Sequence, residues 1–254
     1  MLILALDTST FTGSVALAEW EPEKGPASMR VLAEITAVTE KHAETLIGRI
    51  AWCLDQAGRD KKDLGALAYA RGPGSFTGLR VGLAALKGIA IASRRPLVAV
   101  PTLTALSMRV HGYPGPVAVV MDARRGEVFL GCYDVSMIDT EPAPIFQEQA
   151  ITPDDAVLRL KSIPIRDRKG LMLGDGIARF PALFKPMAKQ GSWLTAPPHL
   201  STPRASDVAF LACFRLGRAE TFDPASAPLV YLRDSGAKPM RADPSAIDII
   251  KPRE

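Results

Sequence analysis

The chain has 254 residues, of which 47% are hydrophobic and 23% charged, a composition that excludes wholesale disorder. With 31 Lys and Arg against 27 Asp and Glu, its formal charge of +4 excludes a strongly basic nucleic-acid coat protein. Its three cysteines lie far apart and form no CxxC pair, so neither a disulfide framework nor a zinc knuckle is expected. The N-terminal residues lack the basic segment of a signal peptide. Together with the cysteine pattern, this predicts a cytoplasmic protein.

The first hundred residues predict an alternation of strands and helices. Strands are expected at residues 2–6, 14–18, 29–38, 65–70 and 97–100. A helix is expected from residue 39 or 40 to about 57, because Leu46, Ile50 and Leu54 recur at helical spacing. A second helix is expected from about 77 to 93, with Ser75 or Thr77 as its N-cap. This order of elements indicates an α/β layered domain.

The middle of the chain repeats part of this pattern. A strand at 117–122 ends in Asp122, a turn follows at 124–126, and a return strand is expected at 127–133. Asp7 and Asp122 would then occupy equivalent places, each at the end of a strand and before a hairpin. This favours two related lobes, although two hairpins can also look alike by chance.

The rest of the chain is less regular. Residues 134–164 are proline-rich and predict no regular element, whereas residues 171–173 predict a strand. A helix is expected at about 205–217, and it could pack back on the first lobe. The predicted limits are 1–101 for an N-terminal α/β lobe, 102–233 for a smaller second lobe, and 234–254 for a tail that is flexible or wraps around a partner.

The turn at Asp7, Thr8 and Ser9 is rich in groups that could hold a phosphate, and its aspartate could hold a magnesium–water shell. The other interpretation is that Asp7 closes an Asx-turn and the hydroxyls serve only the hairpin. The matching turn at Asp122 and the Gly-Asp-Gly at 174–176 resemble the phosphate and adenosine turns of the actin, hexokinase and Hsp70 (ASKHA) architecture. Degenerate binding of ATP or ADP at Asp7, Thr8, Ser9 and Asp122 is therefore a candidate.

The glycine-rich loop at 72–78 lacks the Gly-Lys-Ser/Thr ending of a Walker motif, which favours a tight strand-to-helix connection. The helix after it contains Gly78, Gly82 and Gly88, and a glycine inside a helix costs about 1 kcal/mol relative to alanine. Close approach of another backbone would compensate that cost. The approaching backbone could belong to the chain's own sheet or to another subunit, and Trp52 on the preceding helix could extend such an interface.

Groups for catalysis or metal binding are sparse. His42 has no second histidine at helical spacing, no GxSxG motif is present, and Cys53 lies among apolar neighbours. The sequence therefore predicts neither a catalytic residue nor a metal site.

Five segments together resemble the TsaB (YeaZ) family: ILALDTST at 3–10, KHAETL at 41–46, ARGPGSFTGLRVGLAALKGIA at 70–90, PTLTAL at 101–106 and MDARRGEVF at 121–129. The resemblance is dense over the first half and thinner beyond it. It implies a two-lobed ASKHA fold with RNase H-like lobes, of which the second is reduced. It also implies kinship to TsaD, the transferase that adds threonylcarbamoyl to the adenosine beside the anticodon of certain tRNAs.

The same resemblance implies a protein that is non-catalytic by itself. It would pair with a TsaD-like protein, work with a TsaE-like ATPase, form a homodimer when alone, and touch tRNA only indirectly or weakly. The pairing would use the helices near 41–57 and 77–93. The expected interface residues are His42, Leu46, Arg49, Ile50, Cys53, Gly74, Phe76, Thr77, Gly78, Arg80, Val81 and Gly82.

Two other functions stay open from the sequence. One is a stand-alone ASKHA-type ATPase or kinase that uses Asp7 and Asp122. The other is a metallopeptidase of the M22 kind, for which the HxxxH metal pair is missing near His42.

Overall fold

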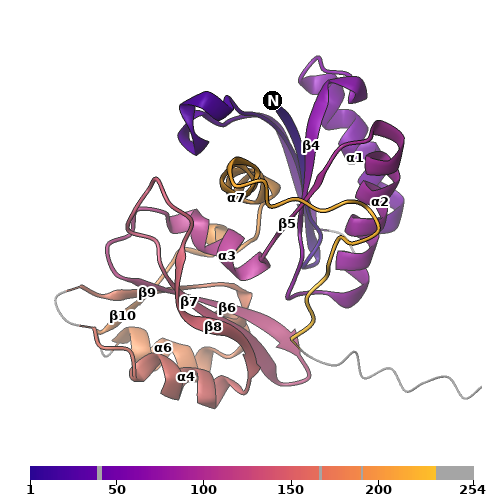
Figure 1. The fold of residues 1–254 in the computed structure, drawn as a ribbon. Helices are drawn as coiled ribbons and strands as arrows, with labels where there is room; N and C mark the ends of the chain where they lie inside the picture. The colour runs from indigo at the N-terminus through magenta and orange to yellow at the C-terminus, as the bar shows by residue number, and fades with distance from the viewer. Residues whose placement is uncertain (39–41, 166–167, 190, 233–254) are drawn as a thin grey trace, which may run out of the picture.

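The structure is a computed structural model that describes residues 1–38, 42–165, 168–189 and 191–232. This part contains two five-stranded sheets with helices around and between them (Figure 1). The first sheet has the order β3-β2-β1-β4-β5, in which β1 to β3 are antiparallel and β4 and β5 run parallel to β1. Its strands are β1 (Leu2–Asp7), β2 (Thr12–Glu19), β3 (Arg30–Val38), β4 (Leu64–Ala70) and β5 (Leu97–Val100).

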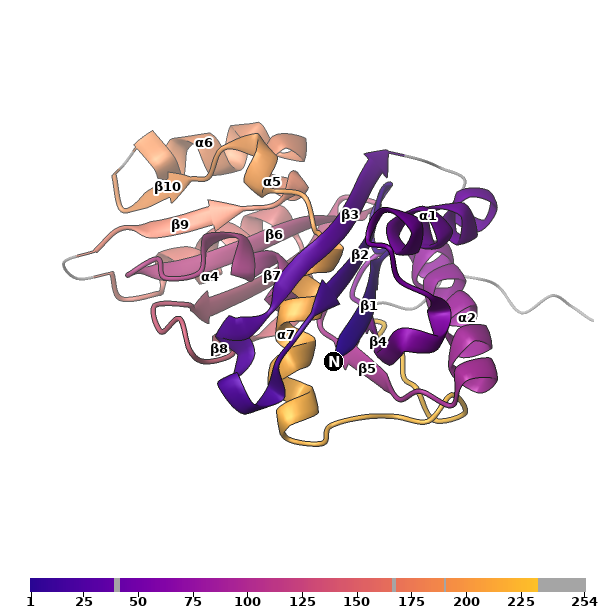
Figure 2. The same ribbon diagram turned by 90° about the horizontal axis from the view of Figure 1, so that it is seen from above.

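The central strand β1 is apolar at nearly every position, so both faces of the first sheet must be shielded from water. Helices cover both faces. Leu4 packs towards α1 (His42–Gln56) and α2 (Phe76–Ser93), whereas Ile3 packs towards α7 (Ala205–Gly217). Figures 1 and 2 show α1 and α2 side by side on one face and α7 on the other. A strand buried on both faces has a continuous apolar sequence, as the first six residues of this chain do.

The second sheet has the order β10-β9-β6-β7-β8. Its strands are β6 (Pro116–Arg124), β7 (Glu127–Asp134), β8 (Ala143–Ile151), β9 (Gly170–Leu173) and β10 (Trp193–Thr195). Counted from the hairpin side, both sheets consist of three antiparallel strands followed by two parallel ones. The internal repeat expected from Asp7 and Asp122 is therefore confirmed in the strand order, since β1 and β6 are the equivalent central strands.

The remaining helices complete the layers. They are α3 (Thr102–Ser107), α4 (Pro153–Lys161), α5 (Asp175–Arg179) and α6 (Pro181–Lys189). Short 3-10 helices lie at Pro22–Lys24, Pro26–Ser28, Lys61–Asp63, Met108–Val110 and Pro198–Leu200. Helices α3 and α7 lie between the two sheets, while α4 and α6 cover the far face of the second sheet (Figure 1). The second sheet thus has a core on each face, as the first one does.

The structure corrects the prediction for the second half. Residues 134–164 contain strand β8 and helix α4, where no regular element was expected. Helix α6 and strand β10 were not predicted either. Both expected helices of the first half are present, and the side chain of Ser75 caps α2 by accepting a hydrogen bond from the N–H of Gly78. The expected tail at 234–254 lies outside the described residues.

Helix α2 is long and apolar enough to cross a membrane by length and composition alone. In the fold it packs along the first sheet, and Leu79, Leu83 and Leu86 are buried there. The inward face of a domain helix therefore accounts for much of its apolar character.

A C-terminal segment ties the first sheet to the space between the sheets. The hydroxyl of Tyr69 donates to the carbonyl of Pro228 at 2.8 Å, and the N–H of Val230 donates to the carbonyl of Arg71 at 2.8 Å. We call residues 228–232 the strap. The strap runs directly past the loop that connects β4 to α2.

Candidate functional site

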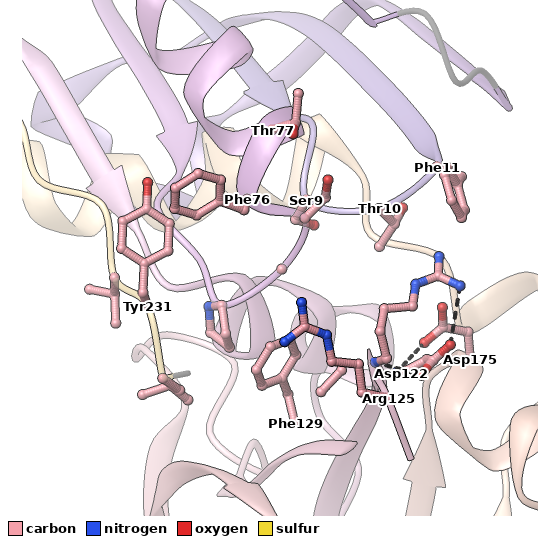
Figure 3. A pocket seen from close by; sticks show the side chains of 17 residues that line it. Ser9, Thr10, Phe11, Phe76, Thr77, Asp122, Arg125, Phe129, Asp175 and Tyr231 are labelled. Atoms are coloured by element: carbon pink, nitrogen blue, oxygen red, sulfur yellow. Dashed lines mark hydrogen bonds and ion pairs between the residues drawn. The ribbon is translucent and has the colours of Figure 1, made fainter. Parts of the chain in front are cut away.

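A cavity of about 320 Å³ lies where the turns after the two central strands approach each other (Figure 3). It is bordered by the β1–β2 turn, the loop before α2, the β6–β7 turn and the strap. Ser9 and Asp122 line this cavity, whereas Asp7 and Thr8 are buried behind it. The structure therefore brings the two predicted phosphate turns together, but only two of the four predicted residues reach the cavity.

The β1–β2 turn uses its own polar groups. The N–H and the hydroxyl of Ser9 both donate to Oδ1 of Asp7, at 2.9 and 2.6 Å. The hydroxyl of Thr10 accepts from the N–H of Thr12 and donates to its carbonyl, each at 3.1 Å. The contact from the N–H of Ser9 to Asp7 is an Asx-turn, as the alternative to phosphate binding expected.

These contacts do not fit a bound polyphosphate at the β1–β2 turn. A phosphate site needs backbone N–H groups and hydroxyls that point outward. Here the N–H and the hydroxyl of Ser9 point to Asp7, and the carbonyl of Ser9 accepts from the N–H of Ser75 at 2.7 Å. Binding of ATP or ADP stays a prediction, and the geometry of this turn argues against it.

The start of α2 is pressed against the same turn. A Cβ atom at Gly78 would lie 2.1 Å from the carbonyl oxygen of Thr8, and one at Gly82 would lie 2.4 Å from the hydroxyl oxygen of Thr8. A Cβ atom at Gly74 would lie 2.6 Å from the carbonyl oxygen of Ser9. The absence of a side chain at these three positions therefore leaves room for the chain's own β1–β2 turn. At Gly78 and Gly82 the geometry favours the alternative in which the helix packs on its own chain, while the expected interface at these residues stays a prediction.

The β6–β7 turn faces this region from the second sheet. Oδ1 of Asp122 accepts the N–H of Arg124 at 2.8 Å, and the N–H of Asp122 donates to Oδ1 of Asp175 at 2.9 Å. Arg125 and Gly126 have φ angles of +51° and +84°, the left-handed pair that a two-residue hairpin turn requires. This geometry directs Arg125 to the cavity, as Figure 3 shows.

An aromatic and arginine cluster closes the other end of the cavity. The rings of Phe76 and Tyr231 lie 4.9 Å apart, and the guanidinium carbon of Arg80 lies 3.7 Å from the centre of the Phe76 ring. Nε of Arg80 also donates to the hydroxyl of Tyr231 at 3.1 Å. Phe76 and Arg80, two predicted interface residues, thus hold the strap against α2.

Several other predicted interface residues point inward. Leu46, Ile50 and Cys53 are buried in the core beneath α1, and burial raises the pKa of the Cys53 thiol to about 11. Arg49 donates to the carbonyl of Gly13 at 3.1 Å. The backbone of His42 begins α1, but its side chain lies outside the described part of the chain. The burial of Leu46, Ile50 and Cys53 argues against direct contact of these three side chains with a partner, and the expected interface stays a prediction.

The outer face of α1 and α2 offers a different set of residues. Ile47, Trp52 and Ile91 are 58%, 43% and 69% exposed. A Cβ atom at Gly48 or Gly88 would meet no atom within 4 Å. Thr77 and Arg80, both predicted, are exposed at one end of this face, and Val81 is half-buried there. Ile47 lies about 60° around α1 from buried Ile50, and Ile91 about 120° around α2 from buried Leu79, so helical position gave no clear signal for the exposure of either residue.

Among the described residues, no group of three or more His, Cys, Asp or Glu side chains is placed to hold a metal ion. The cavity does contain two neighbouring carboxylates, Asp122 and Asp175, and two arginines, Arg124 and Arg125. Of these two arginines, Arg124 forms an ion pair with Asp122 at 3.3 Å.

Comparison with known proteins gives consistent matches over most of the chain. The family model for TsaD, tRNA N6-adenosine threonylcarbamoyltransferase, matches residues 31–239. The tRNA threonylcarbamoyladenosine biosynthesis protein TsaB of Bacillus subtilis is 30% identical over 216 residues, which are 83% of this chain and 86% of that protein. The protein of the same name from Escherichia coli is 28% identical over 243 residues, 93% of this chain and 96% of that protein.

The solved structures agree with these matches. YeaZ from Pseudomonas aeruginosa superimposes with a TM-score of 0.73 at 28% identity, over 91% of this chain and 100% of that one. The expected ASKHA-type α/β fold is thereby confirmed, together with the two repeated sheets.

Proposed function

Since this chain belongs to the TsaB (YeaZ) family of tRNA threonylcarbamoyladenosine biosynthesis proteins, we propose that it serves this modification as a non-catalytic subunit docked on a TsaD-like transferase. Membership of the family supports the role in this tRNA modification. The docking role is our inference from the surface of the first sheet.

The observation that carries the proposal is the outer face of α1 and α2. Exposed Ile47, Trp52 and Ile91 present apolar surface on two neighbouring helices. A partner that spans both helices would bury these exposed apolar side chains. Gly48 and Gly88 lie in the same two helices, and nothing in the chain's own packing explains them. A partner helix could approach the backbone closely at both glycines, which would offset their cost in helix stability.

Docking of this kind can activate an enzyme without supplying a catalytic group. If the subunit binds the active conformation of the transferase more tightly than the inactive one, it shifts the population towards the active one. The TsaE-like ATPase would join this pair, and tRNA would contact the subunit only indirectly. In the absence of the transferase, the same apolar face would pair with a second copy of the chain.

Nucleoside mass spectrometry of cellular tRNA tests the role. Depleting the protein should lower threonylcarbamoyladenosine, and the native chain should restore it. Ile91→Glu should fail to restore it, because a charge then lies in the docking face. Leu158→Glu is the matched control, since Leu158 is 65% exposed on α4, which covers the second sheet.

Two results would count against the proposal. Unchanged threonylcarbamoyladenosine after depletion would reject the role in the modification. Full restoration by Ile91→Glu would reject the docking face, provided that the variant is present at the level of the native chain.

A further inference from the structure

A second cavity, of about 380 Å³, lies on the other side of the strap and has no part in the docking role. It is lined from the first sheet's side by Arg71 and Arg215, and from the second sheet's side by Tyr133 and Glu148. Val230 of the strap borders both this cavity and the one described above. Its volume is at the small end of the range for ligand sites, about 300–1,000 Å³.

Arg71 is the unusual residue in this cavity. Its backbone is fixed, because its N–H donates to the carbonyl of Val100 and its carbonyl accepts from Val230, both at 2.8 Å. Its Nε is buried and has no hydrogen-bond partner within the described chain. Burial lowers the pKa of Arg71, and the like charge of Arg215 lowers it further. The charges of Glu148 and Glu141 act in the opposite direction and raise the pKa of Arg71. The unpaired Nε nevertheless shows that the protein's own acceptors do not saturate this guanidinium, and an unpaired buried donor is unfavourable.

The acidic groups nearby are already engaged. Glu141 pairs with Nε of Arg215 at 2.9 Å and also with Arg218. Oε1 of Glu148 accepts the phenol hydroxyl of Tyr133 at 2.7 Å, and burial raises the pKa of Glu148. Neither carboxylate makes a hydrogen bond with Nε of Arg71. Both carboxylates attract the charge of Arg71, but its guanidinium keeps donor capacity that an incoming oxyanion can use.

We propose that Arg71 binds the carboxylate or phosphate group of a small metabolite in this cavity. An oxyanion accepts N–H donors in the fork geometry that a guanidinium provides, and this pairing is stronger than a neutral hydrogen bond. A ligand held there contacts both sheets at once. It would therefore fix the arrangement of the two sheets around the strap.

The direct test is nuclear magnetic resonance of the arginine Nε–H groups in the full chain. Sodium phosphate and sodium acetate are added separately at matched ionic strength, with sodium chloride as the reference. The Arg71 signal, identified by its loss in Arg71→Gln, should shift in a saturable way with phosphate, with acetate or with both. Phosphate alone would identify a phosphoryl ligand, and acetate alone a carboxylate. A shift no larger than that with chloride would overturn the proposal.

Thermal unfolding gives a second readout. The anion that shifts Arg71 should raise the melting temperature of the native chain. In Arg71→Gln, the anion concentration needed for the same rise should be about tenfold higher or more. Arg95→Gln is the matched control, because Arg95 is an exposed arginine outside this cavity, and it should respond as the native chain does. If Arg71→Gln does not fold, the titration of the native chain still decides, with Arg71→Lys used to identify the signal.

Discussion

At the scale of single residues, Asp207 combines burial with an incomplete ion pair. Its Oδ2 lies 3.8 Å from Nε of Arg109, and neither atom has a hydrogen-bond partner in the described chain. Burial raises the pKa of Asp207 to about 7, which the charge of Arg109 opposes and the charges of Glu34 and Asp7 reinforce. Arg204 acts in the same direction as Arg109. The folded protein therefore holds a proton that the unfolded chain has already released at neutral pH.

This proton makes stability depend on pH. An aspartate in an unfolded chain has a pKa of about 3.9, so between about pH 4 and 7 only the folded state keeps the proton. The contribution of Asp207 is full below this window and is lost as the pH rises through it. Asp207→Asn should therefore gain stability relative to the native chain as the pH rises. Urea unfolding at about pH 5 and about pH 7.5 measures this. Parallel pH dependence in the two proteins would contradict the assignment.

The residues of the candidate site show how far the sequence could lead. From the residue types at the ends of two equivalent strands, the sequence predicted that Ser9 and Asp122 lie close together. This follows because the equivalent strand ends of a repeated fold face each other between the two sheets. The types could not show that the N–H and hydroxyl of Ser9 turn inward to Asp7, at 2.9 and 2.6 Å. An Asx-turn and a phosphate turn use the same residues, and only the direction of the donors separates them.

At the scale of elements, helix α2 uses its glycines for two different purposes. Gly78 admits the turn at Thr8, whereas Gly88 faces open space. The sequence predicted that glycines in this helix need a compensating contact, but it treated them as one surface. The two positions are ten residues apart, which at about 100° per residue leaves them only about 80° apart around the helix, so helical spacing alone could not separate their surroundings.

The same substitution at these two glycines should have opposite effects. Gly78→Ala should lower the free energy of unfolding by about 1–3 kcal/mol, because its Cβ would lie 2.1 Å from a backbone oxygen. Gly88→Ala should raise it by up to about 1 kcal/mol, through helix propensity alone. Chemical unfolding of the isolated chain measures both. Equal destabilisation by the two variants would show that Gly88 is also packed against the chain.

The elements that the sequence missed have weak local signals. Strand β8 is an edge strand with no fully buried residue, so it lacks a regular apolar pattern. Helix α6 contains Pro186, which normally argues against a helix interior, and β10 is three residues long. Helix α4 did carry a signal, since Thr152 caps it and Pro153 is its first residue. By contrast, β1 and β4 were predictable because β1 is buried throughout and β4 at all positions but Gly65.

At the scale of the whole molecule, the fold repeats one sheet topology and separates two kinds of surface. The space between the sheets contains both cavities and the strap, with polar and charged side chains. The outer face of the first sheet's helices exposes Ile47, Trp52 and Ile91. Exposed apolar side chains on that face are consistent with a subunit that meets its partner there.

The proposed docking depends on that outer face, and calorimetry with a purified TsaD-like transferase tests it directly. The double variant Ile47→Glu/Ile91→Glu should bind the transferase with a Kd raised by about tenfold or more, while its melting temperature stays near that of the native chain. Leu158→Glu should bind as the native chain does. Equal affinity of the double variant and the native chain would contradict the account, because the partner would then dock elsewhere.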